Sequence, residues 1–213
     1  MSSSLQVLFA NTLWIKTVIN VVALGYLAYL FVGLFLSWLG PNPIETITHE
    51  TGTWALNFLM ATLAVSPVRR WSRWNRLIKY RRFLGLWSFA FVSLHLLVFL
   101  FFDHFFDLAS MWEDIVDRPY ISVGFLAFLL MLPLAVTSYK TLQRRLGKRW
   151  LQLHRLIYVI AILAILHYWW LVKADISMPV LYGLITIILL SDRVYLAIKK
   201  AREVAPNSHI ARR

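Results

Sequence analysis

The stretch LGKRWLQLHRLIYVIAILAILHYWW, residues 146–170, decides the fold class of this chain. It opens with basic residues and continues into an apolar run long enough to form a membrane-spanning helix. Two histidines, His154 and His167, lie thirteen residues apart within it. A titratable ring inside an apolar helix is costly in lipid, so both histidines are candidates for a functional role.

The composition of the whole chain agrees with a membrane protein. It has 213 residues, of which 60% are hydrophobic, and a mean hydropathy of +0.65. A soluble domain is about 45–50% apolar and mixes polar with apolar positions along its length. The chain contains no cysteine, which excludes disulfides, thiolate metal sites and Cys-ligated iron–sulfur clusters.

Long uncharged runs alternate with short charged segments. The sequence therefore predicts an all-α polytopic membrane protein, with six transmembrane helices in one bundle and a single domain over residues 1–213. In the last span, Arg193 and Lys199 are expected to extend their charged ends to the lipid headgroups. The six apolar stretches are residues 17–39, 53–68, 83–102, 120–136, 153–172 and 179–198.

The charges of the loops predict the orientation. Residues 69–82 carry seven basic side chains and no acid, residues 140–149 carry five more, and residues 193–213 carry six. Residues 103–118 carry five acids and one base. By the positive-inside rule, both termini and the two basic loops are expected in the cytoplasm. The net charge of +12 is thereby explained by orientation and contact with anionic lipids, and no nucleic-acid partner is expected.

Two histidines are expected at the same depth in the outer half of the membrane. His95 lies twelve residues into the third span, and His167 lies thirteen residues beyond His154 on the fifth. At 1.5 Å per residue, these offsets correspond to about 18 Å and about 20 Å. Two imidazoles that face each other across a helical bundle can ligate one haem iron from both sides, as in b-type cytochromes.

Histidines inside a membrane can also serve roles without haem. Each ring could simply hydrogen-bond a neighbouring helix, and a proton relay would need further ionisable groups at that depth. A structural zinc site would need four ligands. Two rings at one depth on separate helices favour haem ligation. For His49, His104 and His209, a solvated position outside the spans is expected.

His154 is expected at the inner boundary of the membrane. A partner for it would stand thirteen residues before His95, at Arg82, and arginine stays protonated and cannot ligate iron. A second, inner haem is therefore held by His154 alone, by His154 with a non-histidine group, or not at all. Arg81 or Arg82 could instead pair with a haem propionate or a flavin phosphate. On an ideal helix, the rings of His154 and His167 point roughly 140° apart.

Several motifs together resemble the MsrQ (YedZ) family of the ferric-reductase-like transmembrane group, which includes the NADPH oxidases. The resemblance covers roughly residues 43–196. The motifs are RRFLGLWSFAFVSLH (residues 81–95), LGKRWLQLHRLIY (146–158), ILHYWW (165–170), HETGTWAL (49–56) and DRPYISVG (117–124).

The resemblance implies a haem-binding subunit in the bacterial inner membrane, without catalytic residues of its own. Such a subunit passes electrons from quinol or a cytosolic flavin reductase to a periplasmic molybdenum-cofactor methionine-sulfoxide reductase of the MsrP type. It also implies b-type haem on His95, His154 and His167, and FMN. The wider group usually carries two histidines on each of two helices, whereas the third span here has one. The basic segments 69–82 and 140–149 are the candidates for the FMN phosphate.

Two alternatives to this function remain open. A quinol-oxidising cytochrome b with another acceptor would use the same haem pair. A transporter with a histidine proton path would need polar lining and broken helices near the midplane, whereas these spans are almost purely aliphatic and aromatic. The acidic segment 103–118 could dock a partner electrostatically, or it could reflect topology alone.

Overall fold

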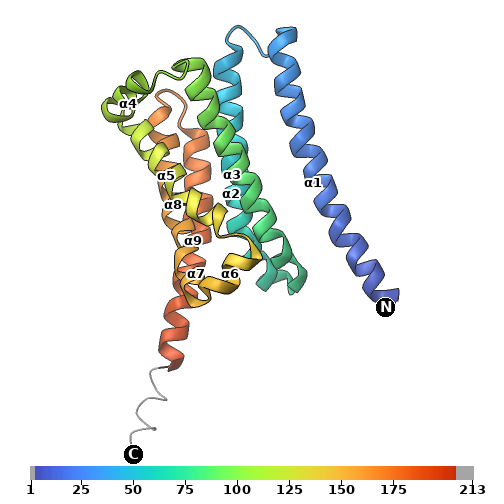
Figure 1. The fold of residues 1–213 in the computed structure, drawn as a ribbon. Coiled ribbons are helices and arrows are strands. Elements are labelled where there is room, and N and C mark those ends of the chain that lie inside the picture. The colour runs from blue at the N-terminus through green and yellow to red at the C-terminus, as the bar shows by residue number, and fades with distance from the viewer. Residues whose placement is uncertain (1–2, 205–213) are drawn as a thin grey trace, which may run out of the picture.

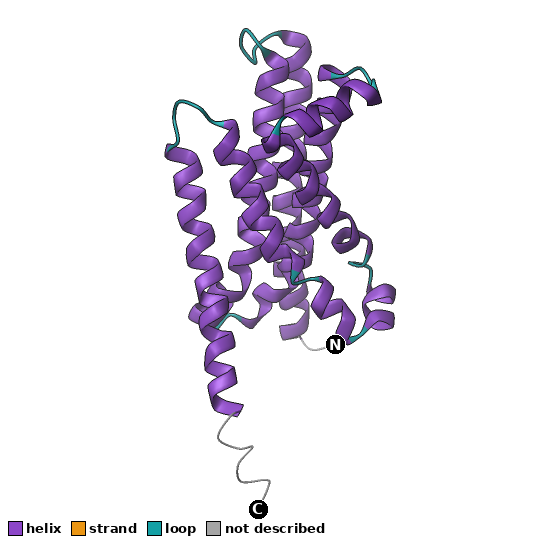
Figure 2. Ribbon diagram, turned by 90° about the vertical axis from the view of Figure 1, so that its left-hand side faces the viewer, coloured by secondary structure: helices purple, strands orange, loops and turns teal. Residues whose placement is uncertain are grey.

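The computed structural model describes residues 3–204, and within them it contains helices and no strand (Figures 1 and 2). The predicted all-α class is therefore confirmed. Short helical segments fill the connections: η1 (Asn75–Leu77), the π-helical turn η2 (Phe99–Asp103), α4 (Leu108–Asp117), α6 (Lys140–Leu146) and α7 (Lys148–Leu153). The six long helices are α1 (Ser3–Leu36), α2 (Pro43–Ser72), α3 (Ile78–Val98), α5 (Pro119–Val136), α8 (Leu156–Leu171) and α9 (Ser177–Val204).

Five stretches of the described residues are long and apolar enough to cross a membrane: residues 12–36, 75–103, 119–136, 148–171 and 177–203. The remaining long helix, α2, has 30 residues and is less apolar. Its polar residues Thr51, Thr62 and Ser66 are buried inside the bundle. Because other helices cover much of α2, it has less need of an apolar surface toward lipid than its neighbours do.

Helix α2 begins and ends with local signals. The side chain of Asn42 accepts the backbone N–H of Glu45, and Pro43 occupies the first turn, where its missing N–H is not needed. The helix ends at Arg73, which adopts a left-handed conformation with φ of 56°. The following turn returns the chain along α2 as α3.

Helices α2 and α3 form the most extensive helix–helix contact among the described residues. Ser88 of α3 donates its hydroxyl to the Ala55 carbonyl of α2 at 2.8 Å. Phe91 is fully buried and stacks on Trp54 and Phe58 of α2. The hydroxyl–carbonyl bond and the ring contacts fix the rotation of α3 against α2, and this rotation decides where His95 points.

Helices α5 and α8 form the second closely packed pair. Ile160 and Ala161 of α8 are almost fully buried against Ala127 and Met131 of α5. The same core includes residues of α2 and Leu189 of α9, so it joins the two helix pairs. The bundle therefore consists of an α2–α3 pair and an α5–α8 pair with α9 against both.

The loops separate by charge between the two ends of the bundle. The connection after α1 and helix α4 lie at one end, which we call the acidic end (residues 37–42 and 104–118) (Figure 1). The connections 73–77 and 137–155 lie at the other end, called the basic end (Figure 1). The start of α1 and the end of α9 both lie toward the basic end. The six long helices connect these two ends. Which end faces the cytoplasm stays a prediction.

The fifth span differs from its expected limits. The sequence predicts one helix over residues 153–172, but α7 ends at Leu153 and α8 begins at Leu156. In the break, the Arg155 N–H donates to the Gln152 carbonyl, and the Tyr158 N–H donates to the Arg155 carbonyl. These bonds span three residues instead of four, so the chain tightens and turns between His154 and α8.

Candidate functional site

The central feature of the bundle is a pair of facing histidines from its two helix pairs. The ring centroids of His95 on α3 and His167 on α8 lie 6.2 Å apart, and the rings are nearly perpendicular at 81°. The two rings thus lie side by side, as their matching depths along the third and fifth spans predict. Metal–imidazole bonds are about 2.0 Å long, so two rings on opposite sides of one metal ion have centroids about 6 Å apart.

Hydrogen bonds fix the protonation pattern of both rings. The Nδ1 of His95 lies 2.9 Å from the Thr48 carbonyl oxygen, and the Nδ1 of His167 lies 2.7 Å from the Tyr120 carbonyl oxygen. A carbonyl oxygen only accepts, so Nδ1 carries the hydrogen in each ring and donates it. The lone pair of each neutral ring is therefore on Nε2, the tautomer that a metal-ligating histidine needs.

The hydrogen-bond partner of each ring comes from the helix that packs beside its own. Thr48 belongs to α2, the neighbour of α3, and Tyr120 belongs to α5, the neighbour of α8. Each imidazole is therefore held inside one closely packed helix pair. The site forms where the two pairs meet, and it fits a group ligated from both sides by imidazole nitrogen.

The structure places His154 apart from this pair. Its Nε2 lies 3.1 Å from the hydroxyl of Thr137, and its ring stacks on Trp150 at a centroid distance of 4.0 Å. The Thr137 hydroxyl donates its only hydrogen to the Pro133 carbonyl at 2.6 Å. The Nε2 of His154 is therefore the donor to Thr137, which is the opposite tautomer to that of His95 and His167. Its role as a ligand stays a prediction.

The two candidate arginines differ in their exposure. Arg81 is half-buried at the basic end of α3, whereas Arg82 is exposed. Any pairing of either residue with a propionate or a phosphate stays a prediction.

Sequence reasoning missed two arginine contacts at the basic end. The expectation that Arg193 reaches the headgroups is wrong, because its Nη2 donates to the Leu63 carbonyl of α2 at 3.1 Å. Its neighbour Asp192 forms an ion pair with Arg70 of α2. Side chains that are adjacent in sequence thus tie α9 to α2, and the isolated acid beside a base in an apolar span was the available signal.

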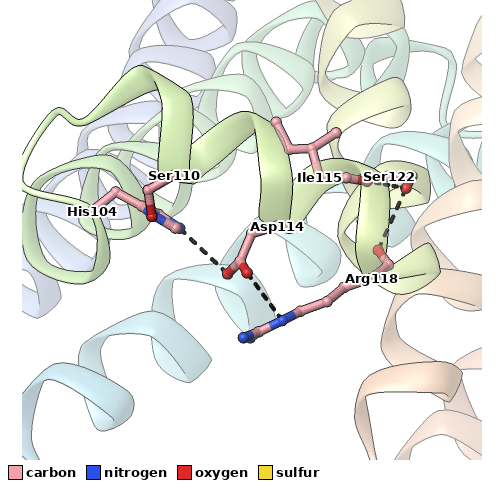
Figure 3. Close-up of polar contacts among 6 residues, drawn as sticks. All are labelled: His104, Ser110, Asp114, Ile115, Arg118 and Ser122. Atoms are coloured by element: carbon pink, nitrogen blue, oxygen red, sulfur yellow. Dashed lines mark hydrogen bonds and ion pairs between the residues drawn. The ribbon is translucent and has the colours of Figure 1, made fainter.

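The acidic end carries a short polar network that sequence reasoning also missed (Figure 3). His104, expected to be solvated, is only 7% exposed. Its Nδ1 lies 3.0 Å from the Ser110 hydroxyl, and its Nε2 lies 3.5 Å from Asp114. Asp114 also pairs with Arg118 at 3.2 Å. A side-chain hydrogen bond with Tyr120 and the charge of Asp114 raise the pKa of Arg118 above its ordinary value.

Two further histidines, His49 and His209, were also expected to be solvated outside the spans. His49 is exposed, as expected, although it lies on α2 and not in a loop. It lines a cavity of about 210 Å³ at the acidic end, together with Asn42, Ile44, Glu45, Thr48 and Asp103. His209 lies outside the described residues.

Fold and site together define an α-helical multi-pass membrane protein with a facing imidazole pair between two helix pairs. The family model described as "Ferric reductase like transmembrane component" matches residues 51–165, which run from within α2 to within α8 and include His95 and His154. No solved structure matches the chain.

Three proteins named "Protein-methionine-sulfoxide reductase heme-binding subunit MsrQ" are similar to this chain. The one from Herminiimonas arsenicoxydans is 50% identical over 87% of each chain. The one from Xanthomonas euvesicatoria is 43% identical over 91% of each, and the one from Azospira oryzae is 51% identical over 76% of this chain and 70% of its own. The chain therefore belongs to the MsrQ family of ferric-reductase-like transmembrane proteins.

Proposed function

We propose that the chain binds b-type haem between His95 and His167 and carries electrons across the bacterial inner membrane. The donor is quinol or a cytosolic flavin reductase at the basic end. The acceptor is a periplasmic molybdenum-cofactor methionine-sulfoxide reductase at the acidic end. One observation carries the proposal: the ring centroids of His95 and His167 lie 6.2 Å apart, and the Nδ1 of each ring lies within hydrogen-bond distance of a carbonyl oxygen, which leaves the lone pair on Nε2.

The residues of the chain hold and shield the site. Bound haem supplies one-electron redox chemistry, so the protein contributes ligands, orientation and surroundings instead of acid–base groups. The Thr48 and Tyr120 carbonyls make the imidazoles stronger donors by accepting their Nδ1–H. Phe91 lies one helical turn from His95 and is fully buried, so the surroundings on that side are dry.

The basic end supports a donor site that binds a phosphate-bearing flavin such as FMN. A hollow of about 560 Å³ lies there, lined by Lys140, Gln143, Arg144, Gly147, Trp150 and Leu151. Lys140 and Arg144 provide positive charge, and Trp150 provides an aromatic face for a planar ring. Trp150 also stacks on His154, so this hollow adjoins the inner histidine. The FMN assignment itself rests on the family resemblance.

Removal of either ligand tests the haem pair. Membranes that contain the full chain should show a Soret band that shifts on dithionite reduction, and the pyridine haemochrome should have the b-type spectrum. His95→Ala and His167→Ala should each abolish the low-spin signal, because one imidazole cannot complete the pair. The exposed His49→Ala is the matched control and should leave the spectrum intact. A colourless wild-type preparation from haem-sufficient cells would refute the proposal.

Reoxidation of the reduced protein by the proposed acceptor distinguishes the proposed function from the two alternatives. The protein is first reduced with dithionite, and the excess dithionite is removed. After it is mixed with a purified periplasmic methionine-sulfoxide reductase, the addition of methionine sulfoxide should reoxidise its haem. A quinol-oxidising cytochrome b with another acceptor would stay reduced in this mixture. A transporter would move protons in liposomes without any change in visible absorbance.

A further inference from the structure

Two helical glycines lie directly against the two facing histidines. A methyl group on the Cα of Gly124 in α5 would stand 2.7 Å from Nδ1 and 2.9 Å from Cε1 of His167. A methyl group on Gly52 in α2 would stand 3.2 Å from Cε1 and 3.3 Å from Nδ1 of His95. Carbon atoms in contact are ordinarily about 3.5–4.0 Å apart, so alanine does not fit at Gly124 and fits at Gly52 only if the ring moves.

The same spacing occurs at both rings. Gly52 lies four residues after Thr48, and Gly124 lies four residues after Tyr120, the residues whose carbonyls accept from the two histidines. In an α-helix, residue i+4 stands one turn above residue i, and its side chain leans back over the carbonyl of that turn. A ring that approaches the carbonyl from the side must occupy this space. The carbonyl is open to an imidazole only because its i+4 residue has no side chain.

We propose that Gly52 and Gly124 are positioning residues for the two imidazoles. Each glycine admits one ring to a helix carbonyl, which fixes the Nδ1–H tautomer and directs Nε2 into the space between the helix pairs. The inference rests on the proposed haem pair and adds two residues that do not ligate. Because a glycine four residues after the acceptor carbonyl occurs on both α2 and α5, the same arrangement determines the orientation of both rings.

Gly124→Ala in the full-length chain tests this role. The added methyl displaces His167 from the Tyr120 carbonyl, so haem affinity should fall about 10–100-fold, as for other losses of an outer partner of a metal ligand. The low-spin spectrum should become mixed with a high-spin component, and the midpoint potential should rise as the imidazole donates less. Gly52→Ala should change the same three readouts in the same direction and to a smaller degree, since its closest approach is 3.2 Å.

Three glycines away from the rings provide matched controls. A methyl group would meet Thr62 at 3.7 Å from Gly85 and Ile165 at 3.8 Å from Gly183, both ordinary contacts. Gly85→Ala and Gly183→Ala should therefore keep the wild-type spectrum and potential. Gly33→Ala tests a steric clash away from the histidines, because its methyl would overlap the ring of Trp38. It should lower thermal stability and leave the spectrum of the loaded protein unchanged.

The outcomes separate this inference from the haem proposal. If His167→Ala loses the low-spin signal while a folded Gly124→Ala keeps wild-type affinity, spectrum and potential, the glycine role is refuted and the haem pair stands. If His167→Ala keeps the signal, the haem pair itself is wrong. Circular dichroism of the haem-free protein shows whether Gly124→Ala folds. If it does not fold, the milder Gly52→Ala decides, and an unchanged spectrum and potential there would overturn the proposal.

Discussion

At the residue scale, the three histidines in or beside the spans show how one side chain takes two roles through its tautomer. His95 and His167 donate from Nδ1 to carbonyls and keep the Nε2 lone pair, whereas His154 donates from Nε2 to a hydroxyl. The neighbour decides the tautomer: a carbonyl or a hydroxyl with its hydrogen already committed can only accept. In this arrangement, His154 links α7 to the end of α5.

Thr137→Val tests the structural role of His154. Valine keeps the shape of threonine and removes the acceptor, so the Nε2–H of the half-buried ring loses its partner. The expected cost is about 1 kcal/mol, which lowers the midpoint of thermal unfolding in detergent by about 2–4 °C. Thr141→Val, at an exposed position of α6, is the matched control. Equal unfolding temperatures for both variants would show that the contact contributes nothing.

At the element scale, the sequence predicts the six long helices because each carries an apolar run between charged segments. It gives no comparable signal for α4 by hydropathy, because acids interrupt the apolar residues there. A spacing signal exists nonetheless: Leu108, Trp112 and Val116 follow each other at intervals of four residues, and Asp107 caps the helix by accepting from Ala109 and Ser110.

For the candidate site, the sequence predicts the depth of the histidines but not the direction in which their rings point. Residue counting places His95 and His167 at one depth, because rise per residue is nearly constant in a helix. The rotation of each helix about its axis depends on contacts between helices, such as Ser88 with Ala55, which no local pattern encodes. Hence the carbonyl partners of the rings, the adjacent glycines and the inward turn of Arg193 emerge only from the packed bundle.

The stability of helix α4 should depend on Asp114. The Asp114 carboxylate lies 3.5 Å from the Nε2 of His104, which precedes α4, and forms an ion pair with Arg118, which follows α4, so Asp114→Ala removes one contact on each side of the helix (Figure 3). Amide hydrogen exchange over residues 108–117 should become about fivefold faster, equivalent to ~1 kcal/mol, while exchange in α2 and α3 is unchanged. Glu113→Ala, which removes an exposed acid on the same helix, should leave exchange as it is.

At the scale of the whole molecule, the charge separation between the two ends matches the direction proposed for electron flow. Basic side chains at 69–82 and 140–149 would attract anionic donors and lipids, and acids at 103–118 would face the acceptor. Within this acidic segment, Asp114 is engaged in an ion pair and Asp107 in a helix cap, so the exposed acids that remain to meet a partner are Asp103, Glu113 and Asp117.

Orientation can be measured directly because the chain has no cysteine of its own. Single cysteines at Pro41 and Ala109, both exposed at the acidic end, should react with a membrane-impermeant maleimide in intact spheroplasts. Cysteines at Asn75 and Thr141, exposed at the basic end, should react only after the membrane is permeabilised. These four positions are uncharged, so the substitutions leave the balance of positive charge that directs insertion unchanged. If Asn75→Cys and Thr141→Cys were labelled in intact spheroplasts, the orientation would be the opposite of the predicted one. The proposed donor and acceptor sides would then be exchanged.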